Sequence, residues 1–168
     1  ATACAAGAAT VWLMSKMHEP LGVTREPLDL SHAVAPFANE HARRLLQFQA
    51  AWNGAVGLSS AFYAVHMLTN LKMGFTWIAA HAVAVASARI LAAPLWGRAL
   101  DRVGARPILL TCSFGISLLP LIWLLPTPER WWPLALEAAL SGFLWSGHAL
   151  ATFTLPLSVA PRKGRAWW

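Results

Sequence analysis

Long apolar blocks separated by short charged segments dominate this sequence. Four such blocks cover residues 45–71, 75–96, 107–125 and 131–159. Each is about as long as the ~20 residues that a helix needs to cross the ~30 Å hydrocarbon layer of a bilayer. Helices of soluble proteins alternate apolar and charged faces within about two turns, and these blocks do not. The pattern therefore predicts an all-α fold, a polytopic bundle of four membrane-spanning helices.

The remaining segments define the predicted domain organisation. Residues 1–14 are apolar but too short to span unaided, so we interpret them as the end of a truncated transmembrane helix. Residues 15–44 are charged and contain three prolines, which break long helices, and we expect a cytoplasmic linker there. Residues 45–168 would then form the four-span bundle with a cytoplasmic tail.

Composition and charge placement support a membrane location. The chain is 57% hydrophobic and 12% charged, against roughly 25% charged residues in soluble domains. Four spans place Lys and Arg mostly on one side, and short loops rich in these residues stay cytoplasmic. That side holds Lys16, Arg25, Arg43, Arg44, Arg98, Arg102, Arg106, Arg162, Lys163 and Arg165, and the other holds Lys72 and Arg130. We expect an integral protein of the bacterial inner (plasma) membrane, with the linker, segment 97–106 and the tail cytoplasmic.

The same placement argues against a nucleic-acid partner, although the net charge is +6. A phosphate-binding groove gathers Lys and Arg on one surface, whereas here they flank the apolar blocks. Cys4 and Cys112 have no metal or redox spacing, so we predict neither a metal nor a cofactor. Membrane lipid is the expected partner.

Small residues recur at helical spacing in two of the predicted spans. Alanines stand at every fourth position from Ala80 to Ala92, and Gly142 and Ser146 show the same spacing. Small side chains let helices approach closely in lipid, where no hydrophobic force drives them together. We predict close helix packing along both stripes.

The charged segment between the second and third spans is a candidate conformational latch. We expect Gly97 to remove a side chain where helices cross, and Gly104 to supply the positive φ of a turn. Asp101 is the sole acid among three arginines, and it could pair with one of them or face a helix N-terminus. A charged cluster that breaks when helices slide could hold one conformation.

This segment resembles the signature of the major facilitator superfamily, Gly-x-Leu-Ala-Asp-Arg-x-Gly-Arg-Arg/Lys, which joins the second and third helices of each half. The matching residues are Gly97, Asp101, Arg102, Gly104 and Arg106. Ala99-Leu100 reverses the usual order, and Ala105 stands where arginine is common. The resemblance covers nearly the whole chain. It implies a fragment of a C-terminal half, comprising the end of helix six, the central loop and helices seven to ten.

The resemblance also implies a function, namely secondary active transport of a small solute by alternating access. The partners would be that small-molecule substrate and the missing half of the same transporter. Enzymatic catalysis is not required, so we predict no catalytic residues. The alternatives are a structural membrane subunit and a membrane-embedded enzyme using His66, His81, His148 and Glu137. No zinc-protease or nucleophile-elbow spacing supports the enzyme.

Polar residues inside the spans are candidates for the transport cavity. Gln49, Asn53 and Ser60 share one face of the first span, at steps of four and seven residues. We hypothesise that they face the cavity, the alternative for Gln49 and Asn53 being side-chain bonds that join helices. Arg89 on the second span is a further cavity candidate, the alternative being that it extends to the cytoplasmic interface.

Four polar residues, Glu137, Ser141, His148 and Thr152, share one face of the fourth span. Ser141 and His148 are cavity candidates. We predict that Glu137 and His148 couple transport to protons, because a carboxylate and an imidazole on one face can carry a proton near neutral pH. The alternative is that Glu137 is exposed at the outer interface.

Overall fold

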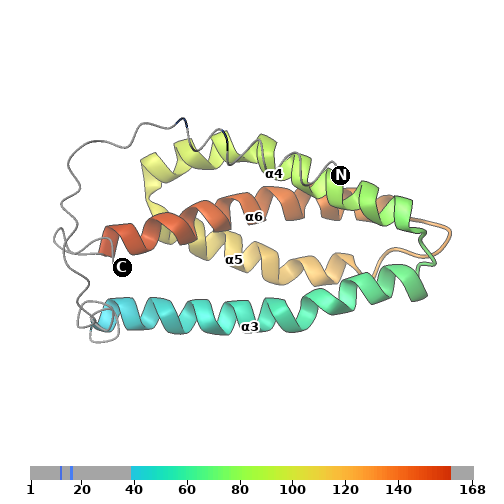
Figure 1. Ribbon diagram of the computed structural model, residues 1–168, viewed down its shortest axis with the longest axis horizontal. Helices are drawn as coiled ribbons and strands as arrows, with labels where there is room; N and C mark the ends of the chain where they lie inside the picture. Colours follow the sequence, from blue (N-terminus) through green and yellow to red (C-terminus); the bar gives the residue numbers. More distant parts are fainter. Residues whose placement is uncertain (1–11, 13–15, 17–38, 160–168) are drawn as a thin grey trace.

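The computed structural model describes residues 12, 16 and 39–159 of the chain. These residues form four helices, α3 (Glu40–Thr69), α4 (Phe75–Val103), α5 (Ala105–Ile122) and α6 (Trp132–Val159), and no strand (Figure 1). The prediction of an all-helical fold is confirmed for this part of the chain. The truncated helix, most of the linker and the tail predicted above lie outside the described residues.

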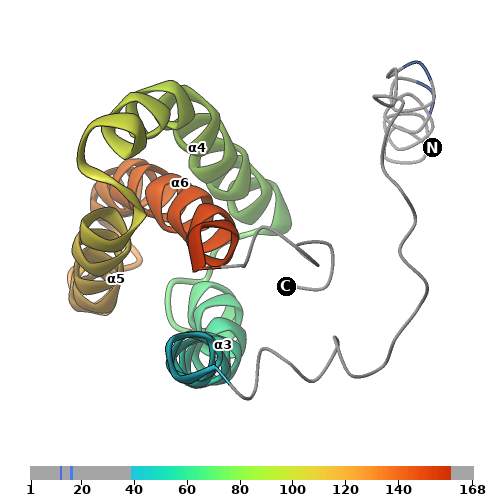
Figure 2. The ribbon, with the colours of Figure 1, turned by 90° about the vertical axis from the view of Figure 1, so that its left-hand side faces the viewer.

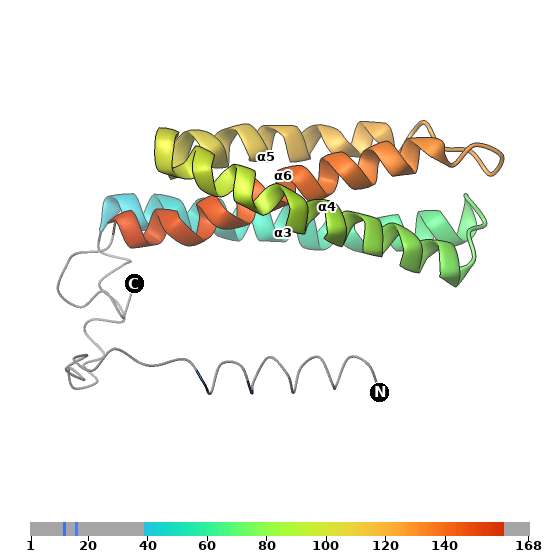
Figure 3. The same ribbon diagram turned by 90° about the horizontal axis from the view of Figure 1, so that it is seen from above.

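The helices lie side by side lengthwise, and successive helices run in opposite directions (Figures 1 and 3). Helix α6 lies between α4 and α5 and packs along both of them, whereas α4 and α5 contact each other little (Figure 2). Helix α3 stands apart from this group, with few close backbone approaches to α6. The architecture is therefore a packed layer of three helices with a fourth helix held mainly by side chains.

A glycine allows α4 and α6 to cross with their backbones in contact. A methyl group at Gly142 would lie 2.5 Å from the Val85 carbonyl oxygen and 2.6 Å from the Ala88 Cβ. Ala92 is buried as well, whereas the first two alanines of the predicted stripe are exposed. The expected close packing is thus present from the middle of α4 onward.

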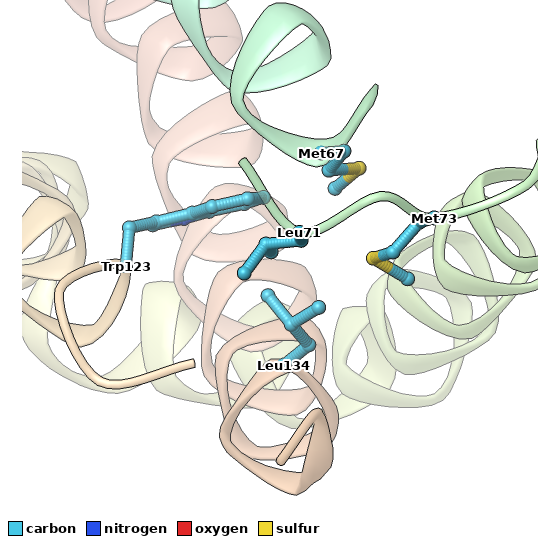
Figure 4. Close-up of a cluster of buried hydrophobic side chains, with 5 residues drawn as sticks. All are labelled: Met67, Leu71, Met73, Trp123 and Leu134. Atoms are coloured by element: carbon cyan, nitrogen blue, oxygen red, sulfur yellow. The ribbon is translucent and has the colours of Figure 1, made fainter. Parts of the chain in front are cut away.

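One end of α3 is fixed by a buried cluster that we call the turn cluster, consisting of Met67, Leu71, Met73, Trp123 and Leu134 (Figure 4). Leu71, which is 2% exposed, lies at its centre. The cluster joins the connection between α3 and α4 to the end of α5 and the start of α6. It gives α3 a fixed point, although most of that helix is loosely packed.

The connection between α4 and α5 is shorter than predicted. Helix α4 continues past Trp96 to Val103, so the loop expected over 97–106 is reduced to Gly104 alone. Charged side chains do not end a helix when they project from its surface, and a φ of +84° at Gly104 does. Gly104 therefore plays the predicted part, but a Cβ at Gly97 would meet nothing within 4 Å, so its expected role at a helix crossing is wrong.

Helix α3 begins earlier than predicted. Residues up to 44 were predicted to belong to the linker, whereas the helix starts at Glu40. The Asn39 side-chain oxygen accepts a hydrogen bond of 3.3 Å from the Ala42 amide, as an N-cap residue does. Glu40 also pairs with Arg44 one turn later at 2.6 Å, on the exposed surface.

The outer surface of the bundle is strongly apolar. Of the described helices, α4 and α5 are long and apolar enough to cross a membrane, so length and composition support two of the four predicted spans. Each of the four helices carries large apolar side chains that expose most of their surface. Examples are Leu58, Phe62, Ile90, Phe114 and Phe153. Soluble monomers rarely expose so much contiguous apolar surface.

Most basic residues of the described helices lie near the ends of the bundle, and more of them lie at one end than at the other. The start of α3 and the Gly104 turn lie at one end, which carries Arg43, Arg44, Arg98, Arg102 and Arg106. The two longer connections lie at the opposite end, which carries Lys72 and Arg130. The charge asymmetry derived from the sequence is therefore also present in the described structure.

Candidate functional site

A cavity of about 440 Å³ lies between α3 and the three packed helices, and all four helices line it. Its walls are mainly apolar and aromatic, and they include Trp52, Tyr63, Trp123 and Trp145. Ligand pockets usually have volumes of roughly 300–1,000 Å³ and this kind of lining. We call this space the central cavity.

A buried histidine–glutamate pair forms part of the cavity wall. The Nε2 atom of His81 donates a hydrogen bond of 2.8 Å to Oε2 of Glu137, and the two side chains are 14% and 6% exposed. The ring of Trp123 packs edge-on against His81, with 5.8 Å between ring centroids. A buried carboxylate requires such a partner, because an unpaired charge away from water is strongly unfavourable.

The crossing of α4 and α6 explains why these two side chains meet. The two helices run in the same direction, and Gly142 of α6 lies against the backbone of α4 near Ala88. His81 precedes that point by seven residues and Glu137 precedes it by five, so both lie on the same side of it at a similar height.

A second, smaller cavity of about 190 Å³ lies between α4 and α6 and reaches the other side of the same pair. His81 lines both cavities, and the smaller one is also lined by Trp77, Trp131 and Leu134. The imidazole therefore borders two spaces, whereas Glu137 lines the central cavity and not the smaller one.

The second ionisable group of α6 lies behind the aromatic wall. His148 is 5% exposed and stacks on Trp52, with ring centroids 4.7 Å apart and 21° between planes. Trp145 contacts the same imidazole edge-on at 5.5 Å. Both tryptophans line the central cavity and His148 does not, so the two indoles cover the imidazole.

Several polar atoms near this stack have no hydrogen-bond partner within the described part of the chain. They are Nε2 of His148, Nε1 of Trp52, Oε1 of Gln49 and Oγ1 of Thr152, all buried between α3 and α6. Buried polar atoms in proteins are almost always satisfied, and four of the seven unpartnered ones in the described structure belong to residues at or next to this stack.

The structure brings only some of the predicted cavity residues together. Ser60 and Ser141 line the central cavity, whereas Gln49, Asn53 and Arg89 do not. The Asn53 amide instead donates a 2.8 Å hydrogen bond to the Gln49 carbonyl within α3 and is exposed. The position of Asn53 therefore fits neither predicted role, because its side chain binds its own helix.

The predicted proton-coupling pair is not assembled as expected. Glu137 and His148 lie eleven residues apart on α6, about 16 Å along the helix axis. Glu137 is also buried, not exposed at an interface, and its partner is His81. This pairing was not predicted from the sequence, because the two residues are 56 positions apart and no local pattern connects them.

The residues of the predicted latch lie at the basic end of the bundle, away from the central cavity. Gly104 forms the turn between α4 and α5, and its amide donates to the Leu100 carbonyl at 2.9 Å. Asp101, Arg102 and Arg106 are exposed on either side of it, and Asp101 forms no ion pair with another described residue. The structure thus shows the turn but no closed charge network.

Two further observations bear on the class of protein. Among residues 39–159, no group of three or more His, Cys, Asp or Glu side chains is placed to hold a metal ion. Comparisons with protein-family models, with curated proteins and with solved structures give no match. The class of protein is therefore defined by the structure and not by a relative. The described part of the chain is all-helical, with two helices able to span a membrane and an aromatic cavity between its helices.

Proposed function

We propose that this chain is part of a secondary transporter of the major-facilitator type, which moves a small solute across the bacterial inner membrane by alternating access. The observation that carries the proposal is the His81–Glu137 pair at the wall of the central cavity. Ionisable groups within membrane-spanning helices are rare, and those that persist usually mark transport paths.

The outer surface and the ends of the bundle support a membrane location. The exposed apolar side chains of all four helices would contact acyl chains, and the basic end would face the cytoplasm by the positive-inside rule. In this arrangement α3 and α6 cross the membrane as well, with Ser60, Glu137 and Ser141 facing the cavity that they enclose with α4 and α5 instead of the acyl chains.

The packing of α3 supports alternating access. It is fixed at the turn cluster, on which Tyr63 packs, and its further contacts with the packed helices include the rings of Phe48 and Trp52. A helix held in this way can tilt about its fixed end while the α4–α6 crossing stays intact, and the cavity would open at the opposite end. The residues around Gly104 would latch one of the two conformations.

The membrane topology can be tested by labelling single cysteines. Arg102→Cys and Arg130→Cys would be introduced separately into a background with Cys4→Ser and Cys112→Ala, and intact cells treated with a membrane-impermeant maleimide. We expect Arg130→Cys to react in intact cells and Arg102→Cys only after permeabilisation. Labelling of both from the same side would contradict the proposed arrangement.

Transport can be tested with the full gene product in proteoliposomes that contain a trapped pH-sensitive dye. A proton gradient is imposed, and sugars, organic acids and organic cations are added in turn. We expect one class of solute to discharge the gradient, and Glu137→Gln to abolish the effect. Glu129→Gln, a carboxylate in the exposed connection between α5 and α6, is the matched control. A gradient that none of these solutes discharges would contradict the transporter assignment.

A further inference from the structure

We infer that the central cavity selects lipophilic organic cations, an inference that rests on the proposed transport function and names its substrate class. Two independent features of the cavity lead to it, the sign of the charge in its wall and the arrangement of its aromatic rings.

The charge in the cavity wall is negative. Glu137 is the sole carboxylate among the described residues that line the cavity, and these include no Lys or Arg. The nearest basic side chain of α4 beyond His81, Arg89, is exposed outside the cavity. An anionic solute would find no fixed positive charge here, whereas a cation would meet a carboxylate in a medium of low dielectric constant, where attraction is strong.

Aromatic rings lie at two levels of the cavity. Tyr63 packs against Trp123 at 4.8 Å, and Trp123 in turn contacts the imidazole that binds Glu137. Trp52 and Trp145 approach each other at 6.1 Å, and Trp145 is eight residues further along α6 than Glu137, about 12 Å along the axis. A cationic group can therefore lie among Glu137, Tyr63 and Trp123 while an apolar part extends towards the second pair.

Indole and phenol faces attract cations through their quadrupoles, most strongly when water is excluded. The same faces give an apolar solute a large contact area without a specific hydrogen-bond pattern. The serine hydroxyl of Ser60 bonds the Gly57 carbonyl of its own helix, so that donor is already committed. The cavity thus favours solutes recognised by charge and apolar area over sugars recognised by many hydroxyl contacts.

The inference can be tested with tetraphenylphosphonium and with tetraphenylborate, an anion of nearly the same shape. Binding to the purified full chain would be measured by equilibrium dialysis, with gel filtration confirming that each variant is folded. We expect the cation to bind and the anion not to bind. Glu137→Gln should weaken cation binding at least about tenfold, and Trp123→Leu by roughly 5- to 30-fold.

The control variants are Glu129→Gln and Trp132→Leu, which remove an exposed carboxylate and an exposed indole outside the cavity. If Glu137→Gln does not fold, Trp123→Leu and the cation–anion comparison still decide the question. Equal binding of both ions, or loss of cation binding in the controls as in the cavity variants, would overturn the inference.

The outcome also separates this inference from the proposed function. Discharge of a proton gradient by a neutral or anionic solute, without tetraphenylphosphonium binding, would retain the transporter and refute the substrate class. Cation binding without any discharge of the gradient would retain the binding site and refute transport.

Discussion

The close crossing of α4 and α6 makes Gly142→Ala the most informative stability variant. The new methyl group would lie 2.5 Å from the Val85 carbonyl oxygen, 2.6 Å from the Ala88 Cβ and 2.9 Å from the Arg89 amide nitrogen. Two of these three opposing atoms belong to the backbone, so no side-chain rotation relieves the clash. The two helices would have to move apart.

The size of the effect follows from these distances. Carbon atoms in contact normally lie ~3.5–4.0 Å apart, so the helices would separate by about 1 Å. Overpacking of this kind is destabilising by roughly 1–3 kcal/mol. Replacing a helical glycine by alanine returns about 0.5–1 kcal/mol of backbone entropy. We expect a net loss of about 1 kcal/mol in the free energy of unfolding, with weakening of the nearby His81–Glu137 hydrogen bond.

Two glycines of the same chain provide matched controls. A Cβ at Gly57 in α3 or at Gly97 in α4 would meet nothing within 4 Å. Each alanine variant should therefore be stabilised by about 0.5–1 kcal/mol, through backbone entropy alone. Unfolding in mixed detergent micelles, followed by far-ultraviolet circular dichroism, would give the three values on one scale. A Gly142→Ala variant as stable as the two controls would refute the reasoning.

A further outcome follows from a polar contact between α4 and α6. The indole nitrogen of Trp96 donates a 2.7 Å hydrogen bond to a backbone carbonyl of α6. Trp96→Phe should therefore lower the free energy of unfolding by about 1 kcal/mol, as the loss of an interhelical bond in a membrane does. Trp132→Phe, which changes an exposed indole, should leave the free energy of unfolding unchanged in the same assay.

The helices could be predicted from the sequence because they depend on local pattern. The apolar blocks placed the start of α4 at Phe75 and the end of α6 at Val159, as in the structure. The errors occur where charge was taken as the end of a helix. Arg98 and Arg102 are good helix formers, and only the positive φ at Gly104 ends α4. At the other boundary, Asn39 followed by Glu40 was a capping signal that the sequence offered.

The candidate site was harder to predict because its groups come from different helices. Ser60 and Ser141 were identified from their helical faces, but Trp52, Trp123 and Trp145 were not. A helical face indicates which residues point the same way and not which helix stands opposite. The partnership of Glu137 depends on the height at which α4 and α6 cross, and that height is set by a glycine five residues away.

The single non-helical residue between α4 and α5 has a consequence for biosynthesis. These are the two most membrane-compatible helices of the described chain, and they form one hairpin with no intervening segment. A hairpin of this kind can leave the translocation channel for the bilayer as a unit, with its backbone hydrogen bonds already made. Helix α6, which contributes Glu137, would enter lipid afterwards against a preformed surface that offers His81 as its partner. The order of synthesis would thereby shield the carboxylate from the moment it leaves water.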